Sequence, residues 1–173
     1  MNDVLKDHKY IKAITKLSDE IDDRYEFHKQ VSPILVEMGN DREFLKEVVR
    51  RNFTDAGYLS QTWSLYNIPY FFVFENEHVN VKIHLFPRHQ KKVDGIAAHC
   101  IHHHNNYLLT SNAFFGSGYE SMLFKKEVNL NENDLSVKLK VSKHFHQKDW
   151  NPSLVDSWEP HVVFIPEALS ATL

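Results

Sequence analysis

The feature that most constrains this chain is a histidine-rich segment at residues 95–107. Four of its thirteen residues are histidine, and one residue separates His102 from His104. In a β-strand, residues i and i+2 point to the same face, so an extended segment would direct both imidazoles toward one point. A shared metal ion is the simplest explanation, because neutral imidazole nitrogens are good ligands for first-row metals. The rest of the chain must then build a fold around that ion.

The bulk composition is typical of one folded domain. The chain has 173 residues, of which 42% are hydrophobic and 25% charged, so it can form a sizeable core. The formal net charge of −3 gives no strong field that would favour nucleic acid or an anionic membrane. Cys100 is the only cysteine, which excludes an internal disulfide and favours a cytoplasmic location. Neither a signal peptide nor a membrane-spanning run is predicted.

The first 66 residues are predicted to be helical, because apolar residues recur at helical spacing. Ser32-Pro33 fits the N-cap and first position of a short helix that ends at Gly39 as a left-handed residue. Asp41 fits the cap of the next helix. Residues 53–66 are expected to form a further short helix.

From Ile68 onward the pattern is that of a β-protein. Pro69 breaks any helix, and an aromatic run follows at residues 70–74. Residues 79–87 alternate between apolar and polar, and Asn76 between the two runs predicts a hairpin turn. Further strands are predicted at 108–115, 119–128, 135–142 and 161–165, with a polar turn at 129–134 and an irregular segment at 147–159.

These elements predict a single domain spanning residues 1–173, mainly β with N-terminal helices. The helical segment, residues 1–66, would pack on a sandwich or barrel formed by residues 67–173. Short strands at regular spacing with turn signals favour these architectures. No flexible linker separates the two parts, so they are expected to form one unit.

Two histidines are too few for a catalytic metal centre, which needs at least a third ligand and open positions for substrate. The strands after the histidine segment offer His144 and His146, which form a second His-x-His pair, and His161. Glu120 is a carboxylate candidate. The spacing of these residues leaves the choice among them open.

The histidine segment resembles the first motif of the cupins, small jelly-roll β-barrels that hold a metal ion at their centre. That motif places a His-x-His pair between two glycines. Here Gly95 precedes His102 by seven positions, and Gly116 follows His104 by twelve. The order of elements is similar to the cysteine-dioxygenase-like branch of cupins, in which helices precede the barrel. The resemblance covers roughly residues 40–150 and implies a cupin jelly-roll β-barrel preceded by helices.

The resemblance also implies an activity and a ligand set. The activity would be that of a non-haem Fe(II) dioxygenase, which acts with O2 on a small thiol, an amino-acid-like compound or a specialised metabolite. Gly118-Tyr119-Glu120 is similar to a strand start of this branch. The single later histidine of the branch matches His146 best and His144 next. Leu108 or Leu109 stands where many cupins have a glutamate ligand, which favours a three-histidine site.

Further roles follow from proximity in the sequence alone. Tyr107 or Tyr119 would hydrogen-bond the substrate, and His103 would support the ligands from the other face of the strand. Ni, Zn, Mn or Cu are the alternative metals. A metal-dependent isomerase or lyase, or a non-catalytic ligand-binding cupin, is the alternative function. Small molecules are the expected partners, with no nucleic acid and no membrane, and a homodimer through strand edges is the expected assembly.

Overall fold

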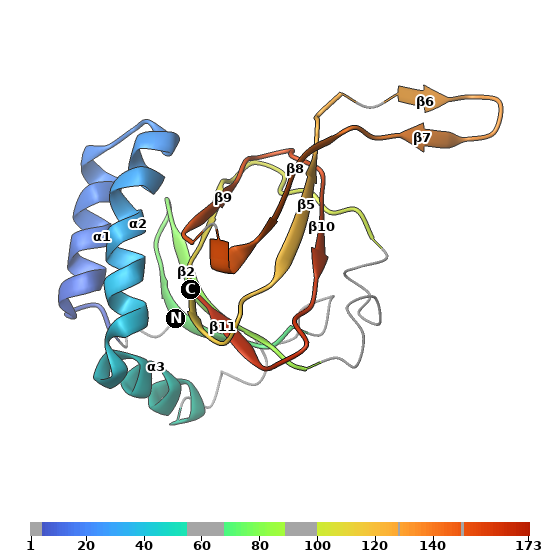
Figure 1. Ribbon diagram of the computed structural model, residues 1–173. Helices are drawn as coiled ribbons and strands as arrows, with labels where there is room; N and C mark the ends of the chain where they lie inside the picture. The colour runs from blue at the N-terminus through green and yellow to red at the C-terminus, as the bar shows by residue number, and fades with distance from the viewer. Residues whose placement is uncertain (1–4, 55–67, 89–99, 128, 150) are drawn as a thin grey trace.

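The computed structural model describes residues 5–54, 68–88, 100–127, 129–149 and 151–173 (Figure 1). Helices occupy the first third of the chain, and short strands follow. The helices are α1 (Lys9–Glu20), α2 (Arg24–Asn40), α3 (Arg42–Thr54) and the short 3-10 helix η3 (Gln147–Asp149). The strands are β1 (Tyr70–Glu75), β2 (Asn80–Phe86), β3 (Leu109–Ser111), β4 (Ala113–Phe115), β5 (Glu120–Phe124), β6 (Asn129–Asn131), β7 (Ser136–Lys138), β8 (Val141–His146), β9 (Ser153–Val155), β10 (His161–Phe164) and β11 (Ser170–Thr172).

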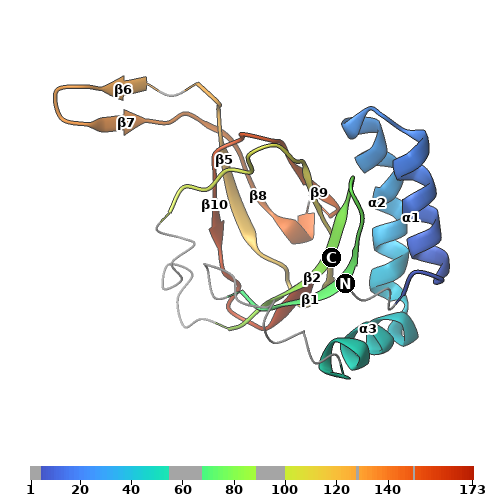
Figure 2. The ribbon, with the colours of Figure 1, turned by 180° about the vertical axis from the view of Figure 1, so that it is seen from behind.

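The strands pair antiparallel in open sheets, and the described ranges contain no closed barrel. The largest sheet has the order β1-β2-β11-β4, and the helices cover one of its faces (Figure 1, Figure 2). A second sheet, β10-β5-β8, lies on the side away from the helices, and β3 pairs with β9. The β6–β7 hairpin projects from the body. N-terminal helices followed by a β-rich part are therefore confirmed, whereas the expected barrel is replaced here by open sheets.

The main hydrophobic core lies between the helices and the four-stranded sheet. On β2, Val81 and Ile83 are buried against the helices, in the alternation that the sequence predicts. Helix α2 supplies a stripe of buried side chains at spacings of three and four residues. They are Phe27, Val31, Leu35 and Met38. In the part of the chain that is described, no helix has the length and apolar character needed to cross a membrane.

Helix α2 is longer than predicted, because it continues through Ser32-Pro33. Its cap is Asp23, whose carboxylate accepts a hydrogen bond from the Glu26 amide at 2.8 Å. An interior proline costs roughly 3 kcal/mol through the lost hydrogen bond and the ring clash. Burial of Val31 and Leu35 on either side of it contributes about 1.5–3 kcal/mol each, which offsets that cost. Tertiary packing therefore decides the helix start.

The prediction for Gly39 is also wrong, because α2 continues to Asn40 and Gly39 does not adopt the left-handed conformation of a helix C-terminus. Gly39 lies where the helix passes close to β4. A Cβ atom there would stand 2.6 Å from the Phe114 Cβ and 3.0 Å from the Asn112 Nδ2. The Asn112 side chain donates to the Leu35 carbonyl at 3.0 Å, which ties helix and strand together. The glycine therefore permits the close approach of α2 to the sheet.

Two local signals are confirmed. Asp41 caps α3, since its Oδ1 accepts a hydrogen bond from the Phe44 amide at 3.0 Å. Asn76 forms the hairpin turn between β1 and β2, since its Oδ1 accepts from the amides of His78 and Val79 at 2.9 and 2.8 Å. The further helix predicted at 53–66 falls almost entirely outside the described residues.

The predicted strand at 108–115 is divided in two by Asn112. Its N–H donates to the Leu173 carbonyl at 2.8 Å, and its carbonyl accepts from the Leu173 N–H at 2.9 Å. The chain thus passes from β3, which pairs with β9, to β4, which pairs with β11. The polar turn predicted at 129–134 contains β6, and the irregular segment at 147–159 contains η3 and β9.

Strand β11 has no counterpart among the sequence predictions, yet it joins β2 to β4 in the middle of the largest sheet. All three residues of β11 are buried, so they lack the alternation of apolar and polar side chains that marks a strand in the sequence. Ser170 also fixes the turn at residues 116–118, because its Oγ accepts hydrogen bonds from the amides of Ser117 and Gly118 at 3.1 and 3.2 Å. Gly118 has φ +71°, a conformation that favours glycine.

Replacing Gly39 with alanine should lower the free energy of unfolding by about 1–3 kcal/mol, because the added methyl group overpacks the contact with β4. Urea denaturation measures the loss. The matched control is Asn40→Ala, at the next and exposed position of the same helix, which should change stability by less than about 0.5 kcal/mol. Equal stability of Gly39→Ala and the parent would contradict the close approach.

Candidate functional site

The histidine run lies beside β10. The His102 N–H donates to the His161 carbonyl and the His161 N–H donates to the His102 carbonyl, both at 2.8 Å. Residues paired in this way place their side chains on the same face, and His104 follows two positions later. The ring centres lie 5.8 Å apart for His102 and His161, and 4.7 Å apart for His104 and His161. The structure thus brings three histidines together.

The sheet register places the other two candidate ligands elsewhere. On β5, Leu123 is paired with His161, whereas the neighbouring Met122 is paired with His144. Successive residues of a strand point to opposite faces, so His144 lies on the face opposite to His161. His146, two residues after His144, shares that opposite face. Of the three histidines that the sequence left open as a third ligand, only His161 lies beside His102.

His144 and His146 have partners of their own. His144 Nε2 lies 2.6 Å from the Oε1 of Glu120, the carboxylate candidate, and both residues lie on this outer face. His146 Nδ1 accepts a hydrogen bond from the Lys148 amide at 3.1 Å. These contacts account for the second His-x-His pair without a metal ion.

Hydrogen bonding fixes the tautomer of His161. Its Nδ1 lies 2.9 Å from the carbonyl oxygen of Glu159. A carbonyl oxygen can only accept, so the proton is on Nδ1 and the lone pair is on Nε2. Burial lowers the pKa of His161, although this hydrogen bond opposes the effect. The ring is therefore neutral at pH 7 and keeps a nitrogen free to bind a ligand.

His104 is also neutral, and it has an unsatisfied nitrogen. Its pKa is lowered to about 4, and burial is the largest cause. Positive charge on the neighbouring His161 and His102 rings lowers the pKa of His104 as well. Its Nδ1 is buried and has no hydrogen-bond partner in the structure. Buried polar atoms without a partner are rare in folded proteins. An additional ligand at this position would satisfy the nitrogen.

The spacing of the three rings is close to that of a metal centre. Two imidazoles bound to one ion at about 2.0–2.1 Å have ring centres roughly 5 Å apart. The His104–His161 separation of 4.7 Å is of this size, and the His102–His161 separation is larger. Within the described ranges, no three His, Cys, Asp or Glu side chains converge as a formed metal site. Binding of an ion by these three histidines would therefore require the rings to turn.

His103 points away from the cluster and stacks on Trp158, with ring centres 5.1 Å apart and planes inclined by 21°. The Trp158 N–H donates to the His104 carbonyl at 2.7 Å, and Trp158 has φ +60°. This conformation is costly for a residue other than glycine and concentrates at functional sites. No sequence signal marks the backbone conformation of Trp158.

The two candidate tyrosines have different surroundings. Tyr107 stacks on His104, with ring centres 4.8 Å apart, and is 56% exposed, so it lies at the edge of the cluster. Tyr119 lies in a separate hydrophobic cluster with Phe86 and Ile165. Burial raises the pKa of Tyr119. Of the two, Tyr107 is the one that the structure brings to the histidines.

A further histidine, His84, lies on the face of β2 that points away from the helices. It is paired with Tyr70 of β1 on one side and Thr172 of β11 on the other. Burial and, to a smaller extent, the charge of Lys82 lower the pKa of His84 to about 4. His84 is therefore an uncharged, half-buried imidazole at neutral pH.

Comparison with known proteins gave no match. No protein-family model matches the chain, and no curated protein or solved structure does. The resemblance to cupins therefore stays a prediction from the motif.

Acidification should destabilise the fold through His84. Its pKa in the folded state lies below the unfolded value of about 6.5, so the unfolded chain binds the proton first. The stabilisation is complete above pH 6.5 and is lost as the pH falls toward 4, by about 1–3 kcal/mol. Urea denaturation between pH 4 and 7 measures the slope.

Two variants isolate that effect. His84→Gln should reduce the dependence of the unfolding free energy on pH in this window, and the remaining dependence comes from His104, whose pKa burial also lowers to about 4. Lys82→Met removes only the smaller cause and should flatten it in part. The same slope in the parent and in His84→Gln would show that His84 is not the titrating group.

Proposed function

We propose that the protein is a cupin-type metal enzyme, a non-haem Fe(II) dioxygenase for a small thiol, an amino-acid-like compound or a specialised metabolite. His102, His104 and His161 would be its ligands. The observation that carries the proposal is the reciprocal backbone pairing of His102 with His161, because it gathers three imidazoles on one face. The third ligand of this proposal is thus His161, in place of the His146 or His144 that the family resemblance implies.

The chemistry of the donors fits such an ion. Imidazole nitrogens suit iron, nickel, copper and zinc, and three of them leave coordination positions open for other molecules. A bound Fe(II) would supply the redox chemistry that reaction with O2 requires. The buried and unpartnered Nδ1 of His104 is the atom that most needs such a ligand.

The surrounding residues would orient the ligands and the substrate. The Glu159 carbonyl accepts a hydrogen bond from Nδ1 of His161 and so orients the ring, which leaves Nε2 on the other side of the ring from this bond. Trp158 binds the His104 carbonyl and covers the His103 ring, which fixes the backbone between the ligands. Tyr107 covers His104 at the exposed edge of the cluster, and its hydroxyl group would hydrogen-bond the substrate there.

The fold and the composition add weaker support. Open antiparallel sheets beside N-terminal helices are loosely compatible with a jelly-roll, so the ligand set carries the proposal rather than the topology. The single cysteine fits the reducing cytoplasm that we propose as its location.

Metal content tests the ligand set. The protein is purified without a tag from cells supplied with iron, and its metals are measured by mass spectrometry. We expect about one iron per chain in the parent. His102→Ala, His104→Ala and His161→Ala should each lose at least about nine tenths of it, because two nitrogens hold an ion far more weakly than three.

His144→Ala and His146→Ala are the matched controls, since they remove the same group from the opposite face of the sheet. Both should retain the metal. Loss in His146→Ala with retention in His161→Ala would restore the family template and contradict our ligand set. Stoichiometric zinc or nickel in place of iron would move the proposal to the isomerase or lyase class. Iron in the parent justifies a screen of thiols and amino acids with an oxygen electrode.

A further inference from the structure

The β6–β7 hairpin leaves the body of the protein as a ribbon of two strands (Figure 1, Figure 2). Within the described ranges, β6 and β7 pair only with each other, so each strand has one edge without a neighbouring strand. The ribbon continues from β5 and β8, and the Lys125 N–H donates to the Lys140 carbonyl at 2.8 Å where it begins. Isolated two-stranded hairpins are marginally stable in water, and open strand edges pair readily with another chain.

Hydrophobic side chains lie on this ribbon without a core beneath them. Leu130 and Val137 are paired across the two strands, so their side chains share one face. They are 57% and 48% exposed, and Leu135 in the turn is 78% exposed. Among the described residues, none of the three belongs to a hydrophobic cluster. Contact with a partner would remove this apolar face from water.

Leu135 also has a backbone conformation that is unfavourable for leucine. Its φ is +56°, in the left-handed region where glycine and asparagine are common and bulky side chains are rare. Polar side chains hold the turn, since Asn131 Oδ1 accepts from the Asn133 amide at 3.1 Å and Asp134 Oδ1 accepts from the Ser136 amide at 2.9 Å. A leucine at this position therefore serves neither the turn nor the core, and a contact outside the chain would explain it.

The charges of the hairpin are divided between its tip and the part nearer the body. Glu132 and Asp134 are the charged residues of the turn. Nearer the body the charge is mainly positive, from these residues: Lys125, Lys126, Lys138 and Lys140, against Glu127. Lys126 forms an ion pair with Asp156 at 2.7 Å. Among the described residues, the two acids of the turn form no ion pair, and neither does Lys138 or Lys140.

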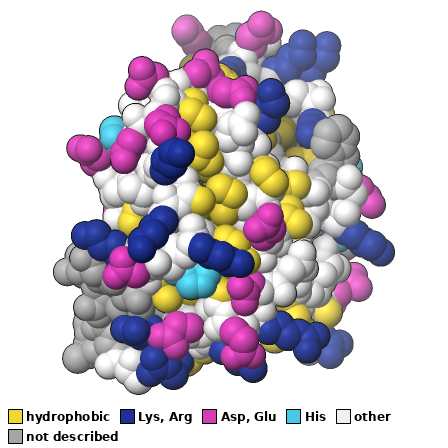
Figure 3. Space-filling view, turned by 90° about the vertical axis from the view of Figure 1, so that its left-hand side faces the viewer, with side chains coloured by type: hydrophobic (Ala, Val, Ile, Leu, Met, Phe, Trp, Pro, Cys, Tyr) yellow, Lys and Arg dark blue, Asp and Glu magenta, His cyan; other side chains and the backbone are white. Residues whose placement is uncertain are grey.

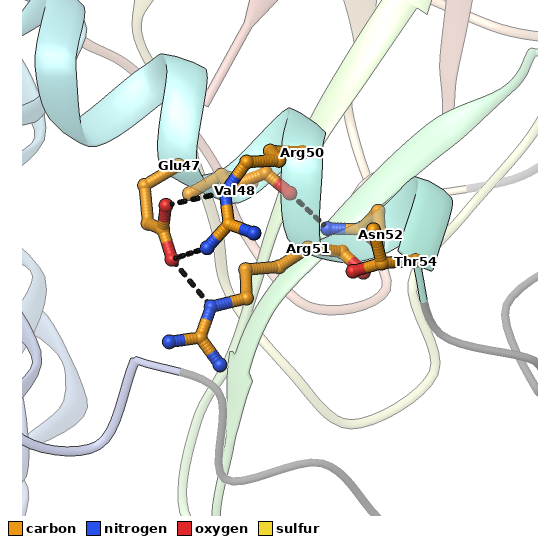
Figure 4. Close-up of polar contacts among 6 residues, drawn as sticks. All are labelled: Glu47, Val48, Arg50, Arg51, Asn52 and Thr54. Atoms are coloured by element: carbon orange, nitrogen blue, oxygen red, sulfur yellow. Dashed lines mark hydrogen bonds and ion pairs between the residues drawn. The ribbon is translucent and has the colours of Figure 1, made fainter.

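The charges on the helices are arranged differently. On the helical side of the molecule, charged side chains of both signs surround a band of hydrophobic side chains (Figure 3). Several of these charges pair within a single helix. On α3, Lys46 lies 2.6 Å from Glu43, and Glu47 binds both Arg50, at 2.8 Å, and Arg51 (Figure 4). The hairpin thus differs from α3 in having its two signs apart and unpaired.

We propose that the β7 edge pairs antiparallel with the β7 edge of a second copy of the chain, across a two-fold axis. The two hairpins then form one sheet of four strands, in the order β6-β7-β7-β6. A two-fold axis makes the two edges equivalent, so the contact closes as a dimer. Centring the pairing on Val137 places all of β7, Ser136–Lys138, against all of β7 in the second copy.

This register brings complementary side chains together. Lys140 of each copy comes to lie opposite Asp134 of the other, and Leu139 opposite Leu135. Residues that are opposite in an antiparallel pair share a face, so the apolar faces of the two ribbons become one. A shift by one residue would put these faces on opposite sides of the sheet. A pairing centred on Lys138 would set two lysines against each other.

Other uses of the hairpin fit these observations less well. A pairing of two β6 edges centred on Leu130 would set Asn129 against Asn131 and would bring no opposite charges together. A membrane could accept an exposed apolar turn, but Glu132 and Asp134 would then face its anionic surface. The hairpin contains none of the proposed metal ligands, so the dimer is a property beyond the proposed function.

Sedimentation velocity over a range of concentrations tests the dimer. The interface is small, so we expect a dissociation constant of about 1–100 μM for the parent. Val137→Lys sets two like charges against each other at the centre of the interface and should raise this constant at least about tenfold. Val36→Lys is the matched control, because it makes the same change at an exposed position of α2. It should dimerise like the parent.

Leu135→Asn separates the contact from folding. Asparagine tolerates a positive φ, so the thermal stability of the monomer should be kept or raised. The dissociation constant of the dimer should rise at least about threefold, because an apolar contact is lost in each half of the interface. This variant also replaces Val137→Lys if circular dichroism shows that Val137→Lys is unfolded.

A single cysteine tests the register, in a background in which Cys100→Ser removes the natural thiol. Val137→Cys places two thiols opposite each other across the axis. Leu130→Cys places them on the outer strands, three strand spacings or about 14 Å apart, which is too far for a disulfide. Under mild oxidation, Val137→Cys should form a covalent dimer at least about ten times faster than Leu130→Cys.

Four results would overturn the proposal. They are a parent that stays monomeric up to about 1 mM, folded variants at 135 and 137 that dimerise unchanged, loss of the dimer in Val36→Lys, and faster cross-linking of Leu130→Cys than of Val137→Cys. Metal content, measured on the same samples, separates this outcome from that of the proposed function. A monomer with bound iron contradicts the dimer alone, and a dimer without metal contradicts the proposed function alone.

Discussion

Two backbone hydrogen bonds between His102 and His161 determine which side chains can act together in this protein. They attach a segment without regular secondary structure to the edge of the β10-β5-β8 sheet, and they set its register. With that register, His102, His104 and His161 share a face, and His103 turns to the other side. Every role that we assign near the cluster depends on this alignment, including the stacking of Tyr107 and the contact of Trp158.

Local signals in the sequence were sufficient for part of the fold. Asp41 caps a helix and Asn76 forms a hairpin turn because each side chain bonds to backbone amides two or three residues away. The start of α2 and the close contact at Gly39 could not be predicted in the same way. Both depend on packing against residues distant in the chain, and such packing outweighs the local preference of Pro33 for a helix start.

The candidate site likewise has one part that local sequence predicts and one part that depends on long-range pairing. The pairing of His102 with His104 can be predicted because spacing by two fixes a shared face in any strand. The third histidine could not be chosen, because spacing says nothing about which strand lies beside the histidine run. A shift of one residue in the register between β5 and β8 would have brought His144 to the face of His161. Long-range pairing therefore decides the ligand set.

The position of β11 has a consequence for synthesis. This strand joins β2 to β4, so the sheet beneath the helices cannot be completed until residues 170–172 have left the ribosome. Until then one edge of the β1–β2 hairpin remains unpaired while the helices and the rest of the chain are already outside. The helices can cover the apolar face of that hairpin, but its free edge gains a neighbour only when β11 emerges. Early misassociation between nascent chains is therefore the hazard that this topology creates.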